Sequence, residues 1–247
     1  MENTGNIQRS YYQRIASKYD QMHVHNNDEH HVALGHIWRF VEKLGISTML
    51  DVGCGTGRGV KYFTTHDPAI KAKGIDPVFD MLLQAVDNNN IPTDCIVCGR
   101  GESLPFGDKS FDAVCALGIL HHVEDHNAVV REMIRVARKA VFISDGNRFG
   151  QGNMLIRLIK LLFYKAHLWG VINFLKTNGR GYVFSEGDGL MYSYSVFDSL
   201  GLIKNLADEI VLLPTESTEA DKKLPVIISA SHILLCVILN KDNASVA

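Results

Sequence analysis

Two adjacent histidines and a later aspartate are the residues best suited to move a proton. His121 and His122 follow an apolar run that predicts a buried strand, and Asp145 ends the next such run. Because neighbouring parallel strands end at the same edge of a sheet, we expect these three side chains to converge there. A carboxylate beside an imidazole fixes the ring tautomer and stabilises the imidazolium, so this group can act as a general base near neutral pH.

A glycine-rich segment, Thr48-Met-Leu-Asp-Val-Gly-Cys-Gly-Thr-Gly-Arg-Gly59, is the second candidate for chemistry. It reads as a strand that contains Asp51, then a tight turn and a helix start, because glycine tolerates positive φ and close approach of a ligand. The dinucleotide pattern G-x-G-x-x-G is excluded, since its third glycine falls on Arg58, Val60 or Tyr62 in the three registers.

The pattern Asp51-x-Gly53-x-Gly55-x-Gly57 resembles the first motif of class I S-adenosylmethionine (SAM)-dependent methyltransferases, in particular their small-molecule (UbiE/type 11-like) branch. Further similar pieces are F-D-x-V from Phe111, L-H-H-V-x-D from Leu120, and the segment 99–106, so the resemblance covers residues 11–145. It implies SAM as cofactor and S-adenosylhomocysteine as product. The alternative is a glycine-rich turn in another α/β protein.

The resemblance also implies a cofactor site. Asp51 suits the ammonium group of SAM, and Asp76, about twenty residues past the glycine loop, is placed to accept both ribose hydroxyls. Arg100 stands where the family usually has an acid that reads adenine, so that contact passes to Glu102 or is lost. Met81 either lines the adenine pocket or is core. The residues expected at the cofactor are Asp51, Gly53, Cys54, Gly55, Gly57, Asp76, Pro77, Met81, Gly101, Glu102, Leu117 and Tyr19.

For catalysis, the resemblance to sugar and natural-product O-methyltransferases implies that one histidine of the pair accepts a hydroxyl proton while Asp145 orients it. We prefer His122 over His121. The alternative is that both histidines only pack or contact SAM, in which case Glu186, Asp188 or Tyr192 are the next candidates for the base. The expected reaction moves a methyl group to a small-molecule acceptor, foremost a hydroxyl oxygen of a sugar or natural-product-like metabolite. Two alternatives are a membrane-associated quinone or lipid methyltransferase and a non-catalytic SAM-binding partner protein.

The N-terminal segment predicts a cover for this site. Tyr12, Ile15, Ala16 and Tyr19 recur at helical spacing and share one face of a short helix. The segment resembles the N-terminal lid of many small-molecule methyltransferases, although the same stripe could pack on the core. No metal ion is expected: the histidines within 23–31 lack the spacing of a defined site, and Cys95 and Cys98 point to opposite faces of a predicted strand.

The apolar periodicity predicts an α/β fold. Together with the resemblance, it leads us to expect a Rossmann-like, seven-stranded, mostly parallel sheet with helices on both faces and an antiparallel C-terminal hairpin. The domain organisation expected is 1–45 as lid helices and 46–247 as the methyltransferase domain, with a substrate-covering insertion at about 148–195. The predicted strands are 48–52, 73–76, 94–98, 110–117, 140–144, 209–214 and 231–240, and the predicted helices are 32–44, 59–65, one from Pro77, one from Asn127, and 153–175.

Composition limits the partners. The 247 residues carry a net charge of -2 with a pI near 6.6, so no general nucleic-acid binding is expected. We expect a cytoplasmic protein, because no signal peptide is recognisable and the longest apolar run, 233–239, is far too short to span a bilayer. The lysine-dotted helix 153–175 is expected to pack in the core or form a homodimer face in preference to a membrane contact.

Overall fold

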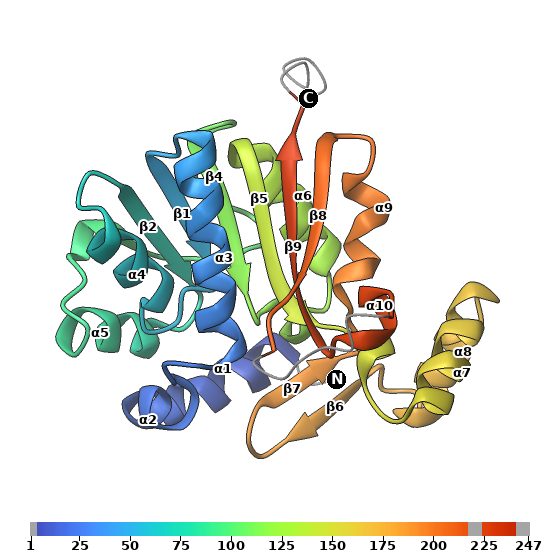
Figure 1. Cartoon of the computed structure of the whole chain (residues 1–247). Coiled ribbons are helices and arrows are strands. Elements are labelled where there is room, and N and C mark those ends of the chain that lie inside the picture. Colours follow the sequence, from blue (N-terminus) through green and yellow to red (C-terminus); the bar gives the residue numbers. More distant parts are fainter. Residues whose placement is uncertain (1–3, 217–223, 241–247) are drawn as a thin grey trace.

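A seven-stranded sheet forms the centre of the computed structural model, which describes residues 4–216 and 224–240 (Figure 1). The strand order is β3-β2-β1-β4-β5-β9-β8, in which β9 runs antiparallel between β5 and β8 and the other neighbours are parallel. The predicted fold class is confirmed. The strands are β1 (Thr48–Val52), β2 (Lys71–Asp76), β3 (Ile96–Cys98), β4 (Phe111–Leu117), β5 (Ala137–Gly146), β8 (Ala207–Pro214) and β9 (His232–Leu239).

Helices cover both faces because successive strand residues point to opposite sides. Val114 and Ala116 pack towards α6 (His126–Val136) and α9 (Leu200–Ile203). Ala113 and Cys115 belong to the opposite core, with α3 (Glu29–Leu44), α4 (Arg58–His66) and α5 (Phe79–Asp87). These buried apolar layers hold the strand ends in fixed register, which is what a site at the sheet edge requires.

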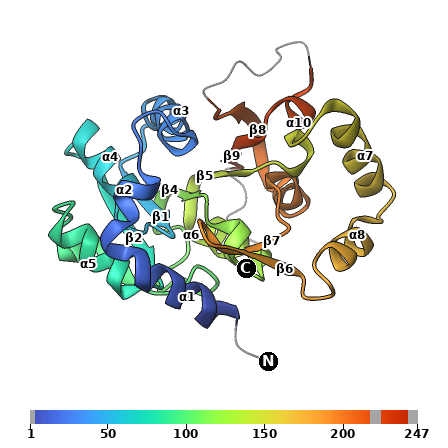
Figure 2. The same cartoon turned by 90° about the horizontal axis from the view of Figure 1, so that it is seen from below.

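Further elements lie across the edge where the parallel strands end (Figures 1 and 2). From the N-terminus come α1 (Thr4–Ile15) and α2 (Tyr19–His23), and from the segment after β5 come α7 (Met154–Lys165), α8 (Trp169–Lys176) and a hairpin of β6 (Tyr182–Ser185) and β7 (Gly189–Tyr192). A short helix, α10 (Val226–Ser229), precedes β9. Within residues 4–216 and 224–240, no helix is both long and apolar enough to cross a membrane.

Several predicted elements need correction. The stretch 153–175 is two helices, because the chain turns at His167, whose φ is +59°. The stripe from Tyr12 to Tyr19 is not one helix, since a 3₁₀ turn, Ala16–Lys18, separates α1 from α2. Pro77 lies two residues before the start of α5. The hairpin β6–β7 was not predicted, as its short strands lie in a segment rich in glycine and polar residues.

Candidate active site

A cavity of about 920 Å³ opens at the carboxyl ends of the parallel strands. Its walls come from α1 and α2, the glycine loop, the segment 100–102, the end of β4, and the hairpin β6–β7. Eleven of the twelve predicted cofactor residues and all three predicted catalytic residues line it. The exception is Gly57, the N-cap residue of α4, with φ of +83°; a side chain there would meet Ile91 Cγ1 at 2.9 Å, so this glycine allows close packing beneath the loop.

The glycine loop adopts the conformation that its sequence requires. Gly53 and Gly55 have φ of +72° and +52°, in the left-handed region that favours glycine. The N–H groups of Gly53 and Cys54 both donate to the carbonyl oxygen of Ile75, at 2.8 and 3.1 Å. The loop is thus tied to the end of β2 and presents its backbone to the cavity.

Asp76 is a buried carboxylate held by two backbone amides. Gly55 N–H donates to Oδ2 at 2.9 Å and Val78 N–H donates to Oδ1 at 2.8 Å. Burial raises the pKa of Asp76 to about 6, although both hydrogen bonds lower it. Each oxygen keeps a second lone pair, so this carboxylate can accept two hydrogen bonds from a ligand that enters the cavity.

Asp51 is buried with less compensation. Cys115 Sγ contacts its Oδ1 at 3.6 Å, and the Gly59 backbone N–H is its other donor. Burial raises the pKa of Asp51 to about 7. A side chain at Gly59 would collide with the Asp51 carboxyl, which explains the last glycine of the segment 48–59. A buried, weakly paired carboxylate of this kind favours a cationic ligand group.

These two carboxylates fit the cofactor that the sequence resemblance implies. SAM carries a ribose diol, which can donate to Asp76, and an ammonium group, which can offset the charge of Asp51. At the predicted adenine end, Arg100 Nη2 pairs with Glu102 Oε1 at 2.6 Å. Arg100 therefore restrains Glu102 beside Gly101 in the cavity wall. Arg100 itself cannot replace the acid that reads adenine in the family, because a guanidinium has no hydrogen-bond acceptor.

The N-terminal elements close one side of the cavity. Thr56 Oγ1 in the glycine loop donates to Asp20 Oδ1 at 2.6 Å, and Asn89 Nδ2 donates to Asp20 Oδ2 at 2.8 Å. Tyr12 and Tyr19 pack with a small buried cluster that includes Met81. The predicted cover is thus attached to the glycine loop by its aspartate. In the predicted histidine cluster, Asp28 accepts from His31 N–H at 2.8 Å and caps α3, and it pairs with Arg58 at 2.5 Å.

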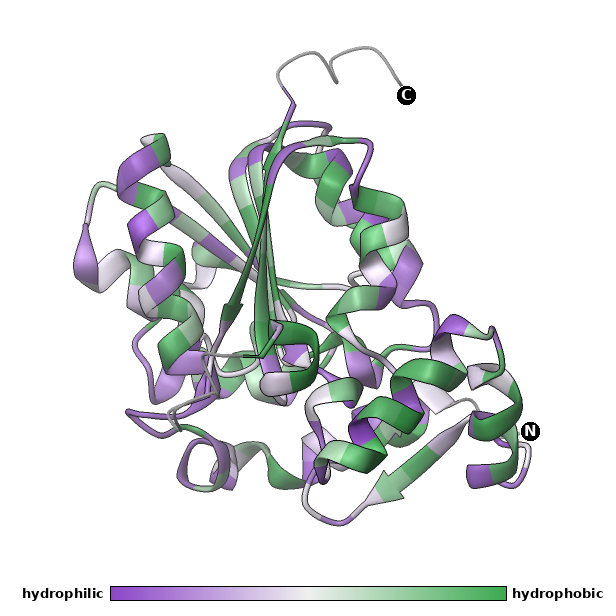
Figure 3. Cartoon of the chain, turned by 45° about the vertical axis from the view of Figure 1, so that its right-hand side comes forward, coloured by the Kyte–Doolittle hydropathy of each residue, from purple (hydrophilic) through white to green (hydrophobic). Residues whose placement is uncertain are grey.

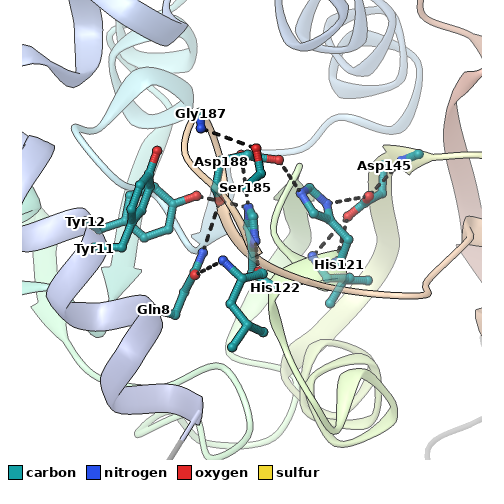
Figure 4. A network of polar contacts seen from close by, with 12 residues as sticks. Gln8, Tyr11, Tyr12, His121, His122, Asp145, Ser185, Gly187 and Asp188 are labelled. Carbon is teal, nitrogen blue, oxygen red and sulfur yellow. Dashed lines mark hydrogen bonds and ion pairs between the residues drawn. The ribbon is translucent and has the colours of Figure 1, made fainter. Parts of the chain in front are cut away.

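His121 lies between two carboxylates (Figure 4). Its Nδ1 is 2.8 Å from Asp145 Oδ1, and its Nε2 is 3.4 Å from Asp188 Oδ2. Burial lowers the pKa of His121, but the charges and hydrogen bonds of Asp145 and Asp188 outweigh it and hold the pKa at about 10. The pKa of Asp145 is about 2, because His121 outweighs the effect of burial. His121 is therefore an imidazolium near neutral pH.

His122 has a different environment. Its Nδ1 lies 2.7 Å from the carbonyl oxygen of Leu190, which can only accept, so Nδ1 carries a proton. Its Nε2 lies 3.0 Å from the Tyr12 hydroxyl and 3.5 Å from Asp188 Oδ1. In the neutral ring this nitrogen holds the free lone pair. The two predicted histidines thus differ in their partners: His121 lies between two carboxylates, whereas His122 contacts a backbone carbonyl, the Tyr12 hydroxyl and Asp188.

Asp188, which the sequence suggested only as a substitute base, and Gln8, which it did not suggest, also contribute to the site. The turn of the β6–β7 hairpin brings Asp188 to both histidines, and Gln8 Oε1 accepts from Leu190 N–H at 2.6 Å (Figure 4). The aspartate between Gly187 and Gly189 was a signal of a tight turn, but not of its partner. Ligand atoms of His121, His122 and Asp188 lie within 4.8 Å of one another and could hold a metal ion, which would have to displace the His121 proton.

Comparison with known proteins agrees with this geometry. Residues 50–143 match the family model described as "Methyltransferase domain". The demethylmenaquinone methyltransferase of Roseiflexus sp. is 33% identical over 132 residues, covering 51% of this chain and 54% of that protein. The 27-O-demethylrifamycin SV methyltransferase of Amycolatopsis mediterranei is 30% identical over 114 residues, covering 44% of this chain and 39% of that protein. The chain spans about half the length, or less, of these curated relatives.

The fold also has solved counterparts. The magnesium protoporphyrin IX methyltransferase of Synechocystis PCC 6803 superposes with a TM-score of 0.61 at 13% identity, covering 96% of this chain and 100% of that one. A likeness at this identity concerns the fold. With the family match over residues 50–143, it confirms the predicted resemblance to class I methyltransferases.

Proposed function

We propose that this chain, which matches the family model described as "Methyltransferase domain" over residues 50–143, transfers the methyl group of SAM to a small-molecule acceptor. One observation carries the proposal: two buried carboxylates and a pair of histidines face a single cavity. The carboxylates suit the polar ends of SAM, and the histidines suit the proton that an acceptor must lose. The chain's own role is to bind, align and deprotonate.

Bound SAM supplies an activated methyl group on a sulfonium, and S-adenosylhomocysteine remains afterwards. Asp76 would hold the ribose hydroxyls and Asp51 the ammonium group, which fixes the position of the sulfur between them. Alignment of this kind can lower a barrier by ~7 kcal/mol or more, because the reacting atoms no longer lose translational freedom. The packed strands β1 and β2 keep these two carboxylates in register.

The favoured acceptor atom is a hydroxyl oxygen of a sugar or natural-product-like metabolite. The bond from oxygen to the methyl carbon forms as the carbon–sulfur bond breaks, and the hydroxyl proton moves to His122 Nε2 and then to water. His122 suits this role since Leu190 fixes its tautomer. His121, charged between Asp145 and Asp188, would position the hairpin and the base. An oxygen acceptor is supported by the relative named 27-O-demethylrifamycin SV methyltransferase, since that name describes a methyl group added to an oxygen.

A quinone or lipid acceptor is the second candidate. It is supported by the demethylmenaquinone methyltransferase among the relatives and by exposed apolar side chains on α7 and α8. The third candidate is that the chain binds SAM as a non-catalytic partner protein and turns over no acceptor. The release of S-adenosylhomocysteine in the presence of a panel of hydroxylated metabolites and amphiphiles separates these three cases.

The histidine variants test the chemical step. Once an acceptor is found, His122→Ala should lower kcat by roughly a hundredfold or more with nearly unchanged SAM affinity, because a general base acts on rate. His121→Ala and Asp145→Asn should affect rate less directly, through a displaced hairpin. Calorimetry with SAM serves as the binding control. Near-normal turnover of both histidine variants between about pH 6 and about pH 9 would remove the pair from catalysis and turn attention to Glu186, Asp188 and Tyr192.

A further inference from the structure

Helix α7 exposes apolar side chains that a surface helix usually buries. Its half-buried side carries two cations beside Leu161 and Tyr164. Arg157 Nη1 donates to the carbonyl of Ile228 at 2.9 Å, and Lys160 Nζ donates to the carbonyls of Arg148 and Gln151, both at 3.0 Å. Its exposed side is apolar. The amphipathic helices of globular proteins bury the apolar side instead, so this helix has an unpartnered apolar face.

Helix α8 extends this face. We define the α7–α8 face by seven of the exposed large apolar side chains on the two helices, which lie next to each other and are largely green in Figure 3. Leu162 is 67% exposed and Phe174 is 62% exposed. The members are Leu155, Leu158, Ile159, Leu162, Val171, Phe174 and Leu175. Isolated exposed leucines are ordinary, whereas a contiguous set of this size marks an interaction surface.

The charged side chains of the segment that carries this face have one sign. Residues 147–185 contain six lysines and arginines and no aspartate or glutamate, although the whole chain has a net charge of -2. Lys165, Lys176 and Arg180 are exposed beside the apolar side chains. An apolar stripe flanked by cations is complementary to a bilayer that contains anionic lipids, since the stripe enters the acyl boundary while the cations meet headgroups.

We propose that the α7–α8 face docks this chain onto anionic lipid bilayers. The same helices contribute Lys160, Trp169 and Asn173 to the cavity wall, so docking would bring the cavity next to the lipid surface. An amphiphilic acceptor could then place its polar group in the cavity while its apolar part stays in the bilayer. This last step rests on the proposed function; docking itself does not.

Vesicle sedimentation tests the proposal. The full chain should pellet with vesicles of equal parts phosphatidylcholine and phosphatidylglycerol, and far less with phosphatidylcholine alone. Leu162→Asp/Phe174→Asp should reduce binding at least tenfold, because two large apolar side chains leave the acyl boundary. Lys165→Gln and Arg180→Gln should each reduce it about fivefold, and added salt should do the same.

A matched control lies on α5, away from these helices. Phe79 is 58% exposed and Leu83 is 41% exposed, and neither lines the cavity. Phe79→Asp/Leu83→Asp introduces the same charges on another exposed helix and should leave vesicle binding unchanged. Asp76→Ala should pellet like the unaltered chain, which separates docking from cofactor binding.

Three results would overturn the docking proposal. The first is equal pelleting with both vesicle types, which would remove the role of anionic lipid. The second is an equal loss of binding in both double variants. The third is a dimer that dissociates in Leu162→Asp/Phe174→Asp while no vesicle binding occurs, because a second copy of the chain would then be what covers the face.

Discussion

Asp51 and Asp76 carry the cofactor side of the proposed reaction, and their burial has a measurable cost. Each is held in the folded chain with a pKa well above that of a free aspartate, at about 7 and about 6. A carboxylate with a raised pKa destabilises the empty protein when ionised. A ligand that supplies a cation and hydroxyl donors removes this penalty, so binding and ionisation of the two aspartates are coupled.

SAM affinity should therefore depend on pH in acid solution. Below its pKa each aspartate is mostly protonated in the free chain, and binding must first remove that proton. The dissociation constant should rise by about tenfold per pH unit for each group as the pH falls below its pKa, between about pH 7 and about pH 5. Calorimetric titrations across this range measure the slope. In Asp51→Asn, the increase of the dissociation constant that begins near pH 7 should disappear. An unchanged slope in that variant would contradict the role of Asp51 in SAM binding.

At the scale of elements, the site is assembled by contacts between distant parts of the chain. Gln8 and Tyr11 on α1 hold the β6–β7 hairpin, since Tyr11 Oη donates to the carbonyl of Glu186 at 3.0 Å and Gln8 accepts from Leu190. Tyr12 reaches His122 from the same helix. The N-terminal segment 4–23 and the β6–β7 hairpin thus form one cover over the cavity, which we call the roof. Each of the two parts holds the other in place.

Hydrogen exchange tests whether this roof closes over the cofactor. SAM should slow amide exchange in residues 12–20, because a segment that contacts a ligand loses its open states. The edge strand β8 lies at the far side of the sheet and should exchange equally with and without SAM. If residues 12–20 also exchange equally under both conditions, the segment is simply packed on the core.

Much of this site could be predicted from the sequence, because the positions where strands end follow from local apolar patterns. Apolar runs predicted β1, β2, β4 and β5, and the residues at or just after their ends, including Asp76 and His121, therefore had to meet at one edge. Asp145 was predicted to meet the histidine pair for the same reason, and it lies 2.8 Å from His121. It does not orient the preferred base, His122, because the Nδ1 of His122 contacts the carbonyl oxygen of Leu190 instead. The roles of these residues in binding and catalysis stay predictions.

Long-range contacts were beyond the sequence pattern. Asp188 depends on how a hairpin near residue 187 packs against a helix near residue 8, and no periodicity encodes that pairing. Gly57 fits the cofactor motif, yet in the folded turn its α-carbon packs next to Ile91 and does not line the cavity. The stretch 153–175 resembled a core helix because its apolar content is high; hydropathy does not say which side faces outward.

For the whole molecule, the functional parts gather at one edge. The cavity, the roof of α1 and the hairpin, and the exposed α7–α8 face all lie where the parallel strands end (Figure 2). The antiparallel strands β9 and β8 extend the sheet beyond β5 and bury apolar side chains on both of its faces. This division lets the edge vary in shape while the core keeps Asp51 and Asp76 in place.

Calorimetric titration with SAM tests the central claim most directly. The chain should bind SAM, and Asp76→Ala should weaken binding by at least ~2 kcal/mol, about thirtyfold in Kd, since both ribose contacts are lost. Gly55→Val should act similarly by placing a branched side chain where the ligand meets backbone. Asp87→Ala, on the exposed side of α5, is the control and should bind like the unaltered chain. A folded Asp76→Ala protein with unchanged SAM affinity would contradict the account.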